Sequence, residues 1–195
     1  MTAIYVKCNL EYTTFTPTIT RAFDTDPQSF EGFYFTGATV KFKNSMICNI
    51  MSVYYPNGPQ NDNSDWLLNF NINNKNCLIL GDFNARSTFW ENTEVKTTSN
   101  RFVENVLNSK LVLLNTGEIT RVPDSSNHRP SAIDLSLASS QIAKDCIWNP
   151  LDDTLGSDHR PIHILLTSEN VNVINDEVED KIPKFNYRFA NWELF

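Results

Sequence analysis

The stretch from Cys77 to Asn84 constrains the fold more than any other part of the chain. Four residues of strand length, Cys77 to Leu80, are apolar, and Gly-Asp-Phe-Asn follows them at once. A short buried strand that ends in a carboxylate and a carboxamide is typical of open α/β sheets, which present functional groups at the carboxyl ends of their strands. Because side chains alternate along an extended chain, Asp82 and Asn84 are predicted to face one side and Phe83 the other.

Apolar and alternating segments of this kind recur along the chain. They predict strands at 2–7, 33–42, 46–54, 77–80, 111–114, 132–137, 146–148 and 161–167, and helices at 64–70 and 99–109. Several of these strands end in polar groups. The prediction is therefore an α/β fold of two packed sheets with helices outside them and a site along one rim. Residues 1–167 form the predicted domain, and residues 168–195 read as an acidic linker and an aromatic tail.

Three finer predictions concern buried apolar side chains. The helix at 99–109 is expected to bury the stripe Phe102, Val103, Val106 and Leu107. In the loop after Asn84, Phe89 and Trp90 are expected to fold back onto the domain. The first strand is expected to turn Ala3 and Tyr5 inward.

Composition sets broad limits on the kind of protein. With 41% hydrophobic residues, 195 residues suffice for one sizeable core, and no apolar run is long enough to predict a membrane span. Its four cysteines are widely spaced without a C-x-x-C pair, which predicts reduced, buried thiols in an intracellular protein. A net charge of -7 does not favour nucleic-acid binding, although a carboxylate site that recruits a divalent cation supplies positive charge locally.

The polar residues at the strand ends fit the hydrolysis of a phosphodiester. Such a reaction needs an activated water and positive charge or donors for the phosphate oxygens. Asp82 could activate the water or bind metal, and Asn84 could orient the water or contact the phosphate. His159 fits phosphate contact or proton transfer near neutral pH. As its orienting carboxylate, Asp134 is favoured over the adjacent Asp158, whose side chain diverges in an extended chain, and this leaves Asp158 for metal.

Each residue taken alone has a simpler interpretation. Asp82 and Asn84 are common turn residues after a strand, and Tyr54 is an ordinary half-buried strand tyrosine that also fits phosphate contact. His128 and His163 are predicted to be structural or exposed. The functional interpretation depends on several separate strand ends, each of which carries a polar side chain that phosphodiester hydrolysis can use.

Three motifs in this order resemble the endonuclease/exonuclease/phosphatase superfamily. They are Gly81-Asp82-Phe83-Asn84, Ser131-x-Ile133-Asp134 and Gly156-Ser157-Asp158-His159-x-Pro161. The chain is most similar to the apurinic-type endonuclease domain of non-LTR retrotransposons, and Ser52-x-Tyr54-x-Pro56 supports this. The resemblance implies a four-layer α/β sandwich of two mixed sheets flanked by helices. It also implies an enzyme that nicks one strand of double-stranded DNA and leaves a 3'-hydroxyl to prime reverse transcription.

The resemblance assigns a role to each matching residue. Asp82 would activate the attacking water, and Asn84 would orient it. His159, held by Asp134, would contact the scissile phosphate. The residues expected to bind substrate are Tyr54, Asn84 and Ser131. Asp158 and Asp82 would lie near a divalent cation, Mg²⁺ or Mn²⁺.

The sequence departs from the family pattern at its beginning. The family's principal metal-binding glutamate precedes the strand that here begins near Thr2. The chain is therefore expected to lack the first strand and helix of the fold and to be weakly active or inactive by itself. In a complete element the domain would be joined to a reverse transcriptase, without a membrane partner, and would act in the nucleus.

Two other functions remain open at this stage. One is a catalytically dead remnant that binds nucleic acid or serves as a scaffold, which the acidic balance favours. The other is a phosphatase of the same superfamily, because the Asp-x-Asn and Asp-His pairs are shared by both.

Overall fold

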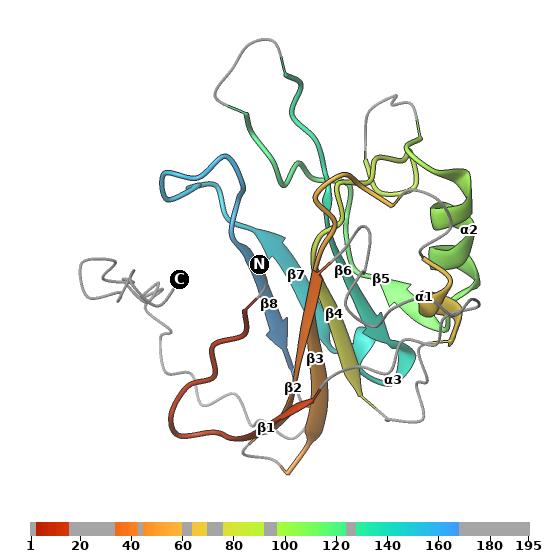
Figure 1. The fold of residues 1–195 in the computed structure, drawn as a ribbon. Coiled ribbons are helices and arrows are strands. Elements are labelled where there is room, and N and C mark those ends of the chain that lie inside the picture. Colours follow the sequence, from red (N-terminus) through yellow and green to blue (C-terminus); the bar gives the residue numbers. More distant parts are fainter. Residues whose placement is uncertain are drawn as a thin grey trace.

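The computed structural model describes residues 3–15, 34–42, 45–59, 64–69, 76–91, 97–123 and 128–167. A six-stranded sheet contains β1 (Glu11–Phe15), β2 (Tyr34–Lys41), β3 (Ile47–Tyr54), β4 (Cys77–Asp82), β5 (Leu111–Leu113) and β6 (Asp134–Ser139). A second sheet consists of β7 (Cys146–Pro150) and β8 (Ile162–Leu166). The helices are α1 (Trp66–Asn69), α2 (Asn100–Asn108) and α3 (Ser140–Ala143). The predicted mixed α/β class is confirmed (Figure 1).

The large sheet has the strand order β1-β2-β3-β4-β6-β5. All neighbouring pairs are antiparallel except β3 and β4, which run parallel. A parallel pair requires a crossover, and here the connection contains α1. This crossover brings the carboxyl ends of β3 and β4 to one rim, beside the amino end of β6.

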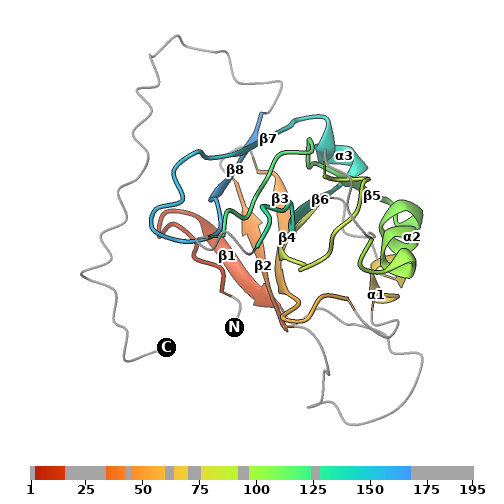
Figure 2. The same cartoon turned by 90° about the horizontal axis from the view of Figure 1, so that it is seen from above.

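One face of the large sheet packs against α1 and α2, as Figure 2 shows from above. Ser99 caps α2, since its hydroxyl accepts a hydrogen bond from the backbone N–H of Phe102 at 3.2 Å. The rings of Phe83 and Phe102 lie 5.6 Å apart in this core, and Phe83 is fully buried. The predicted alternation at the end of β4 therefore holds for Phe83, which anchors the strand end in the core.

The opposite face of the large sheet packs in part against β7, β8 and α3. Trp148 of β7 is buried, and its indole N–H donates to the hydroxyl of Ser136 in β6 at 3.0 Å. The two sheets are thereby joined by a buried polar contact as well as by apolar packing. The strand predicted at 161–167 is present as β8, and its described partner is β7 in the small sheet.

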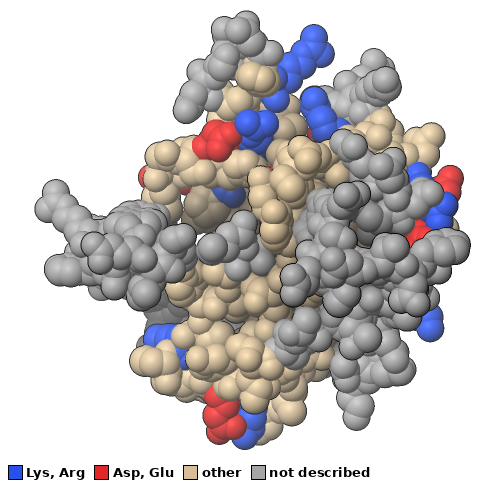
Figure 3. Space-filling model, in the orientation of Figure 1, with Lys and Arg blue, Asp and Glu red and all other residues tan. Residues whose placement is uncertain are grey.

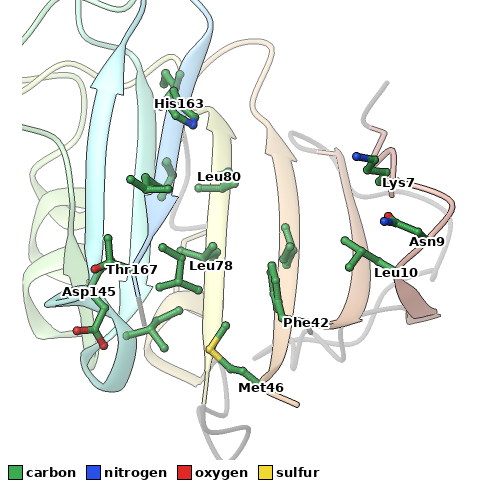
Figure 4. A pocket seen from close by; sticks show the side chains of 16 residues that line it. Lys7, Asn9, Leu10, Phe42, Met46, Leu78, Leu80, Asp145, His163 and Thr167 are labelled. Carbon is green, nitrogen blue, oxygen red and sulfur yellow. The ribbon is translucent and has the colours of Figure 1, made fainter. Parts of the chain in front are cut away.

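An apolar hollow of about 850 Å³ lies beside β8 on this same face (Figure 4). Its floor includes Leu78 and Leu80 of β4, and Phe42 and Met46 lie at the turn between β2 and β3. Leu80 precedes Asp82 by two residues in β4, so the two side chains point to the same face of the sheet, but Asp82 itself does not line the hollow.

Several local predictions are wrong. The first described strand is at Glu11–Phe15, because the pairing with β2 falls on this later segment, where Thr13 lies opposite Thr39. Ala3 and Tyr5, both predicted to turn inward, are exposed, Tyr5 by 79%. Leu107 and Phe89 are exposed. Asn105 takes the buried place expected for Leu107 on α2, where its amide donates to the Ser64 hydroxyl and the Asp65 carboxylate.

Trp90 is buried as predicted. The predicted helical residue Phe70 and the tail 168–195 lie outside the described residues. All four cysteines are free thiols, as predicted, and Cys48 and Cys77 are buried, whereas Cys146 is only partly buried and Cys8 is exposed. None of the described helices has the length and apolar character to cross a membrane.

Candidate active site

Polar and aromatic side chains form a row along the rim where β3 and β4 end. Tyr34 pairs with Tyr54, Tyr54 pairs with Asp82, and Asp82 pairs with Asp134 across four successive strands. Directly paired residues point to the same face of a sheet. The four side chains therefore share one face at one rim, and this is the face that carries β7 and β8.

Gly81 allows this rim to form. A Cβ built on Gly81 would lie 1.8 Å from the carbonyl oxygen of Val53 in β3, and Gly81 has a φ of 152°. Only glycine allows the two backbones to approach this closely. The close approach fixes the position of Asp82 relative to Tyr54 and Tyr55, and the Tyr55 N–H donates to the Asp82 carbonyl at 2.9 Å.

Asn84 holds the carboxylate of Asp82 at both of its oxygens. The backbone N–H of Asn84 donates to Oδ1 at 2.9 Å, and its side-chain Nδ2 donates to Oδ2 at 3.1 Å. The same Nδ2 donates to the Tyr55 carbonyl at 2.8 Å, and Asn84 has a φ of 46°, which asparagine tolerates better than most residues. The observed role of Asn84 is to orient Asp82.

The environment of Asp82 disfavours its charged form. Burial is the main cause and raises the pKa of Asp82 to about 6. The Asn84 N–H lowers this pKa, the charge of Asp134 raises it, and His159 and Arg121 lower it. A carboxylate whose pKa lies near neutral pH is suited to general-base catalysis.

Asp134 and His159 form the charged centre of the row. Nδ1 of His159 lies 2.9 Å from Oδ2 of Asp134 and 3.1 Å from Oδ1. The Thr120 hydroxyl donates to Oδ2 of Asp134 at 2.6 Å. The carboxylate is an acceptor, so Nδ1 carries the proton and Nε2 is directed away from Asp134. The hydrogen bond to Asp134 is the main cause that raises the pKa of His159.

Asp158 lies beside this centre and forms an ion pair with Arg121. Its Oδ2 accepts from Nε of Arg121 at 2.9 Å, and this hydrogen bond is the main cause that lowers the pKa of Asp158. Its Oδ1 lies 4.0 Å from Nε2 of His159. The Asp158 carboxylate therefore stays close to the imidazole, although these adjacent side chains were predicted to diverge, and its observed partner is Arg121.

A metal site is not formed by the described residues alone. Among them, no group of three or more His, Cys, Asp or Glu side chains converges as such a site requires. Asp82 is held by Asn84, and Asp158 is held by Arg121. The donor set in the described ranges does not fit Mg²⁺ or Mn²⁺ without further ligands.

The other predicted residues take varied positions. Tyr54 lies at the rim next to Asp82, as the row requires. Ser131 is buried, with 4% exposure, and its backbone pairs with Arg121 in both directions, at 2.8 and 3.0 Å. This placement suits positioning of Arg121 and does not favour direct contact with substrate. His128 and His163 are exposed and outside the row.

Sequence reasoning missed two residues that build this centre. Thr120 is fully buried, and its hydroxyl also accepts the Asp134 N–H at 3.1 Å. Arg121 pairs with Asp158 and forms β-bridges to Ser131 and His159. Neither residue carries a sequence signal, because both lie in an irregular connection whose course is set by tertiary contacts.

Positive charge is present around the loops above the rim. Figure 3 shows several Lys and Arg side chains at the upper end of the molecule, where the β5–β6 connection and the loop before β8 lie. Some of this charge is neutralised locally, because Arg121 pairs with Asp158 and Arg86 pairs with the buried Glu91 at 2.8 Å. The rim therefore has a mixed charge within a chain of net charge -7.

Comparison with solved structures supports the fold. The chain is similar to the endonuclease domain of TRAS1, a telomere-specific non-LTR retrotransposon, with a TM-score of 0.59 and 17% identity over 84% of this chain and 71% of that domain. It also matches the AP endonuclease LMAP from Leishmania major, with a TM-score of 0.46 and 15% identity over 68% of this chain and 54% of that protein. No curated protein sequence is significantly similar.

A sequence family accounts for more than half of the chain. The family described as endonuclease-reverse transcriptase matches residues 48–163, a segment that contains β3, β4, β6 and the loop with His159. Of the four residues of the row along the rim, Tyr54, Asp82 and Asp134 lie inside the matched segment and Tyr34 lies outside it. The chain therefore belongs to the endonuclease-reverse transcriptase family.

Proposed function

We propose that this chain is a DNA endonuclease domain that hydrolyses one phosphodiester bond in one strand of double-stranded DNA. The observation that carries the proposal is the convergence of Asp82, Asp134 and His159. Asp82 and Asp134 are direct cross-strand partners, and His159 is hydrogen-bonded to Asp134 at 2.9 Å. Family membership supports a nuclease as the general class of enzyme.

Asp82 acts as the general base in this proposal. Its pKa of about 6 leaves it mainly ionised at neutral pH and still basic enough to take a proton from water. Asn84 holds both carboxylate oxygens, so the lone pairs that remain on Asp82 have a fixed direction. The water oxygen attacks phosphorus, and its proton passes to Asp82.

His159 and Tyr54 stabilise the phosphate in the transition state. Since Nδ1 of His159 donates to Asp134, Nε2 is the nitrogen that donates to a phosphate oxygen. The raised pKa of His159 keeps a larger fraction of the imidazole positively charged near neutral pH. Tyr54 lies beside Asp82 on the same face, where its phenol O–H reaches the same phosphate.

The bond that breaks joins phosphorus to the 3' oxygen. The departing 3' oxygen takes a proton from solvent water, so the products are a 5'-phosphate and a free 3'-hydroxyl, which is the group that a DNA-synthesising enzyme extends. We propose that this end primes reverse transcription by a reverse transcriptase domain on the same polypeptide, in the nucleus. Membership of the endonuclease-reverse transcriptase family supports this partnership.

Dependence on a divalent cation is proposed from the family resemblance alone. The described residues do not supply a metal cluster, so the steps above use protein groups only. Mg²⁺ or Mn²⁺ would require further ligands. Nicking that continues unchanged in EDTA would remove the metal from the proposal and leave the rest intact.

A plasmid-nicking assay tests the function. The purified chain is incubated at high concentration with supercoiled plasmid and Mg²⁺, because only weak activity is expected of this chain by itself, and conversion to the nicked circle is measured. Asp82→Ala is expected to abolish nicking, whereas Asp152→Ala, which changes a fully exposed carboxylate in the loop before β8, is expected to leave it unchanged. Nicking by Asp82→Ala at the wild-type rate would refute the assignment.

A second candidate is a domain that binds nucleic acid without cleaving it. It is favoured by the lack of a metal cluster among the described residues and by the engagement of Asp158 with Arg121. Retained DNA binding that weakens steeply with salt, with no nicking by the wild type in Mg²⁺, would support it. A phosphate-release assay run in parallel detects a phosphatase of the same superfamily.

A further inference from the structure

The row at the rim continues beyond Asp82 into a pair of stacked tyrosines. The rings of Tyr34 and Tyr54 lie 6.2 Å apart and are inclined by 19°. Tyr34 is the outer ring and is 56% exposed, while Tyr54 is half-buried. This exposed ring lies on the same rim as the half-buried Asp82, with Tyr54 between them, and is available for contact with a ligand.

The order of the strands fixes where such a ligand would lie. Tyr54 separates Tyr34 from Asp82, and neighbouring strands are about 4.8 Å apart, so Tyr34 lies about two strand spacings from Asp82. The next residues on this face, Thr36 and Ser52, are paired with each other and are uncharged. The charged groups of the row, Asp82 and Asp134, are on the other side of Tyr54.

This arrangement places a flat apolar surface one nucleotide away from the phosphate site. If the phosphate lies between Tyr54 and Asp82, the nucleoside on its Tyr54 side extends toward Tyr34. Aromatic side chains bind nucleobases by stacking, and this contact is tolerant of sequence because every base has an aromatic face. The ring stack between Tyr34 and Tyr54 holds the platform in one orientation.

We propose that Tyr34 forms a nucleobase subsite, in which its ring stacks on the base adjacent to the scissile phosphate. This inference rests on the proposed function, because it needs DNA at the rim. It assigns Tyr34 a binding role outside the segment that the family match covers, residues 48–163. In an intact duplex the base must first unstack from its neighbour to offer its face to Tyr34, at a cost of a few kcal/mol.

Equilibrium binding tests the subsite independently of catalysis. The probe is a labelled DNA duplex with a single-nucleotide gap, which exposes the faces of the flanking bases, and one flanking base is 2-aminopurine. We compare the wild type with Tyr34→Ala, with Tyr34→Phe, which keeps the ring, and with Tyr12→Ala. Tyr12 is the matched control, since it is 54% exposed on β1 of the same sheet.

Tyr34→Ala is expected to bind the gapped duplex roughly tenfold more weakly and to lose the quenching of 2-aminopurine fluorescence. Tyr34→Phe and Tyr12→Ala are expected to bind and quench like the wild type. Wild-type quenching by Tyr34→Ala would overturn the subsite, even if nicking falls, because Tyr34 would then act only through Tyr54. Failure of the wild type to bind any DNA would refute the proposed function and the subsite with it.

Discussion

Substitution of Gly81 by alanine is expected to displace the carboxylate of Asp82, the proposed general base. The new Cβ would lie 1.8 Å from the Val53 carbonyl oxygen, whereas contacts under 3.0 Å are essentially never seen, so β3 and β4 must separate by roughly 1.2 Å. Asp82 is the next residue and moves with the strand. A misplacement of about 1 Å at a reacting group costs on the order of 100-fold in rate. Overpacking of this kind also lowers the free energy of unfolding by about 1–3 kcal/mol.

Gly156 provides a matched control for this experiment. It also has a positive φ, 84°, and lies two residues before Asp158, but a Cβ there meets nothing within 4 Å. Gly156→Ala therefore carries the backbone strain without the clash. Plasmid nicking and urea denaturation are measured for both variants. If Gly81→Ala nicks and unfolds like Gly156→Ala, the close approach of β3 and β4 does not hold the site, and the reasoning is wrong.

Three further predictions concern the charged centre. The rate of nicking is expected to rise as the pH passes about 6, because Asp82 must lose its proton to act as a base. The rate is expected to fall above the raised pKa of His159, because the imidazole then loses its charge. A pH–rate profile that is flat near pH 6 contradicts the assignment of Asp82. Asp134→Asn removes the main cause of the raised His159 pKa, so the alkaline limb should move to lower pH. The rate of nicking should also drop about 10- to 100-fold, as expected for the loss of a charge-assisted hydrogen bond of about 1.5–3 kcal/mol. If the alkaline limb of the pH–rate profile stays at the wild-type pH, Asp134 does not set the pKa of His159. Thr120→Val removes the 2.6 Å hydrogen bond to Asp134 and should lower the free energy of unfolding by about 1–3 kcal/mol in urea denaturation, whereas Thr120→Ser should keep most of it.

Local patterns in the sequence identified most elements of the fold. The alternating segments 33–42 and 46–54 predicted β2 and β3, and the apolar stripe at 99–109 predicted α2, whose Ser99 cap the structure added. The apolar run that ends in Asp82 predicted β4 and the burial of Phe83. These signals are legible because propensity, periodicity and capping act between residues that are close in the chain.

The ordered motifs also predicted that Asp134 would orient His159. The structure brings these side chains to 2.9 Å, and it places both next to Asp82. The choice of Asp134 over Asp158 followed from the divergence of adjacent side chains in an extended chain. The catalytic roles of these residues stay predictions until the variants above are measured.

By itself, the sequence determined which residues are candidates for chemistry, since carboxylate, amide and imidazole groups at strand ends are recognisable wherever the strands pair. Only the tertiary structure decided their partners: Arg121 at Asp158, Thr120 at Asp134, Asn84 at both oxygens of Asp82, and Tyr34 against Tyr54. The physical reason is that strand order and loop course depend on packing between distant segments. A hydrogen bond or a pKa is set by what arrives beside a group in space, and the chain-local pattern does not contain that information.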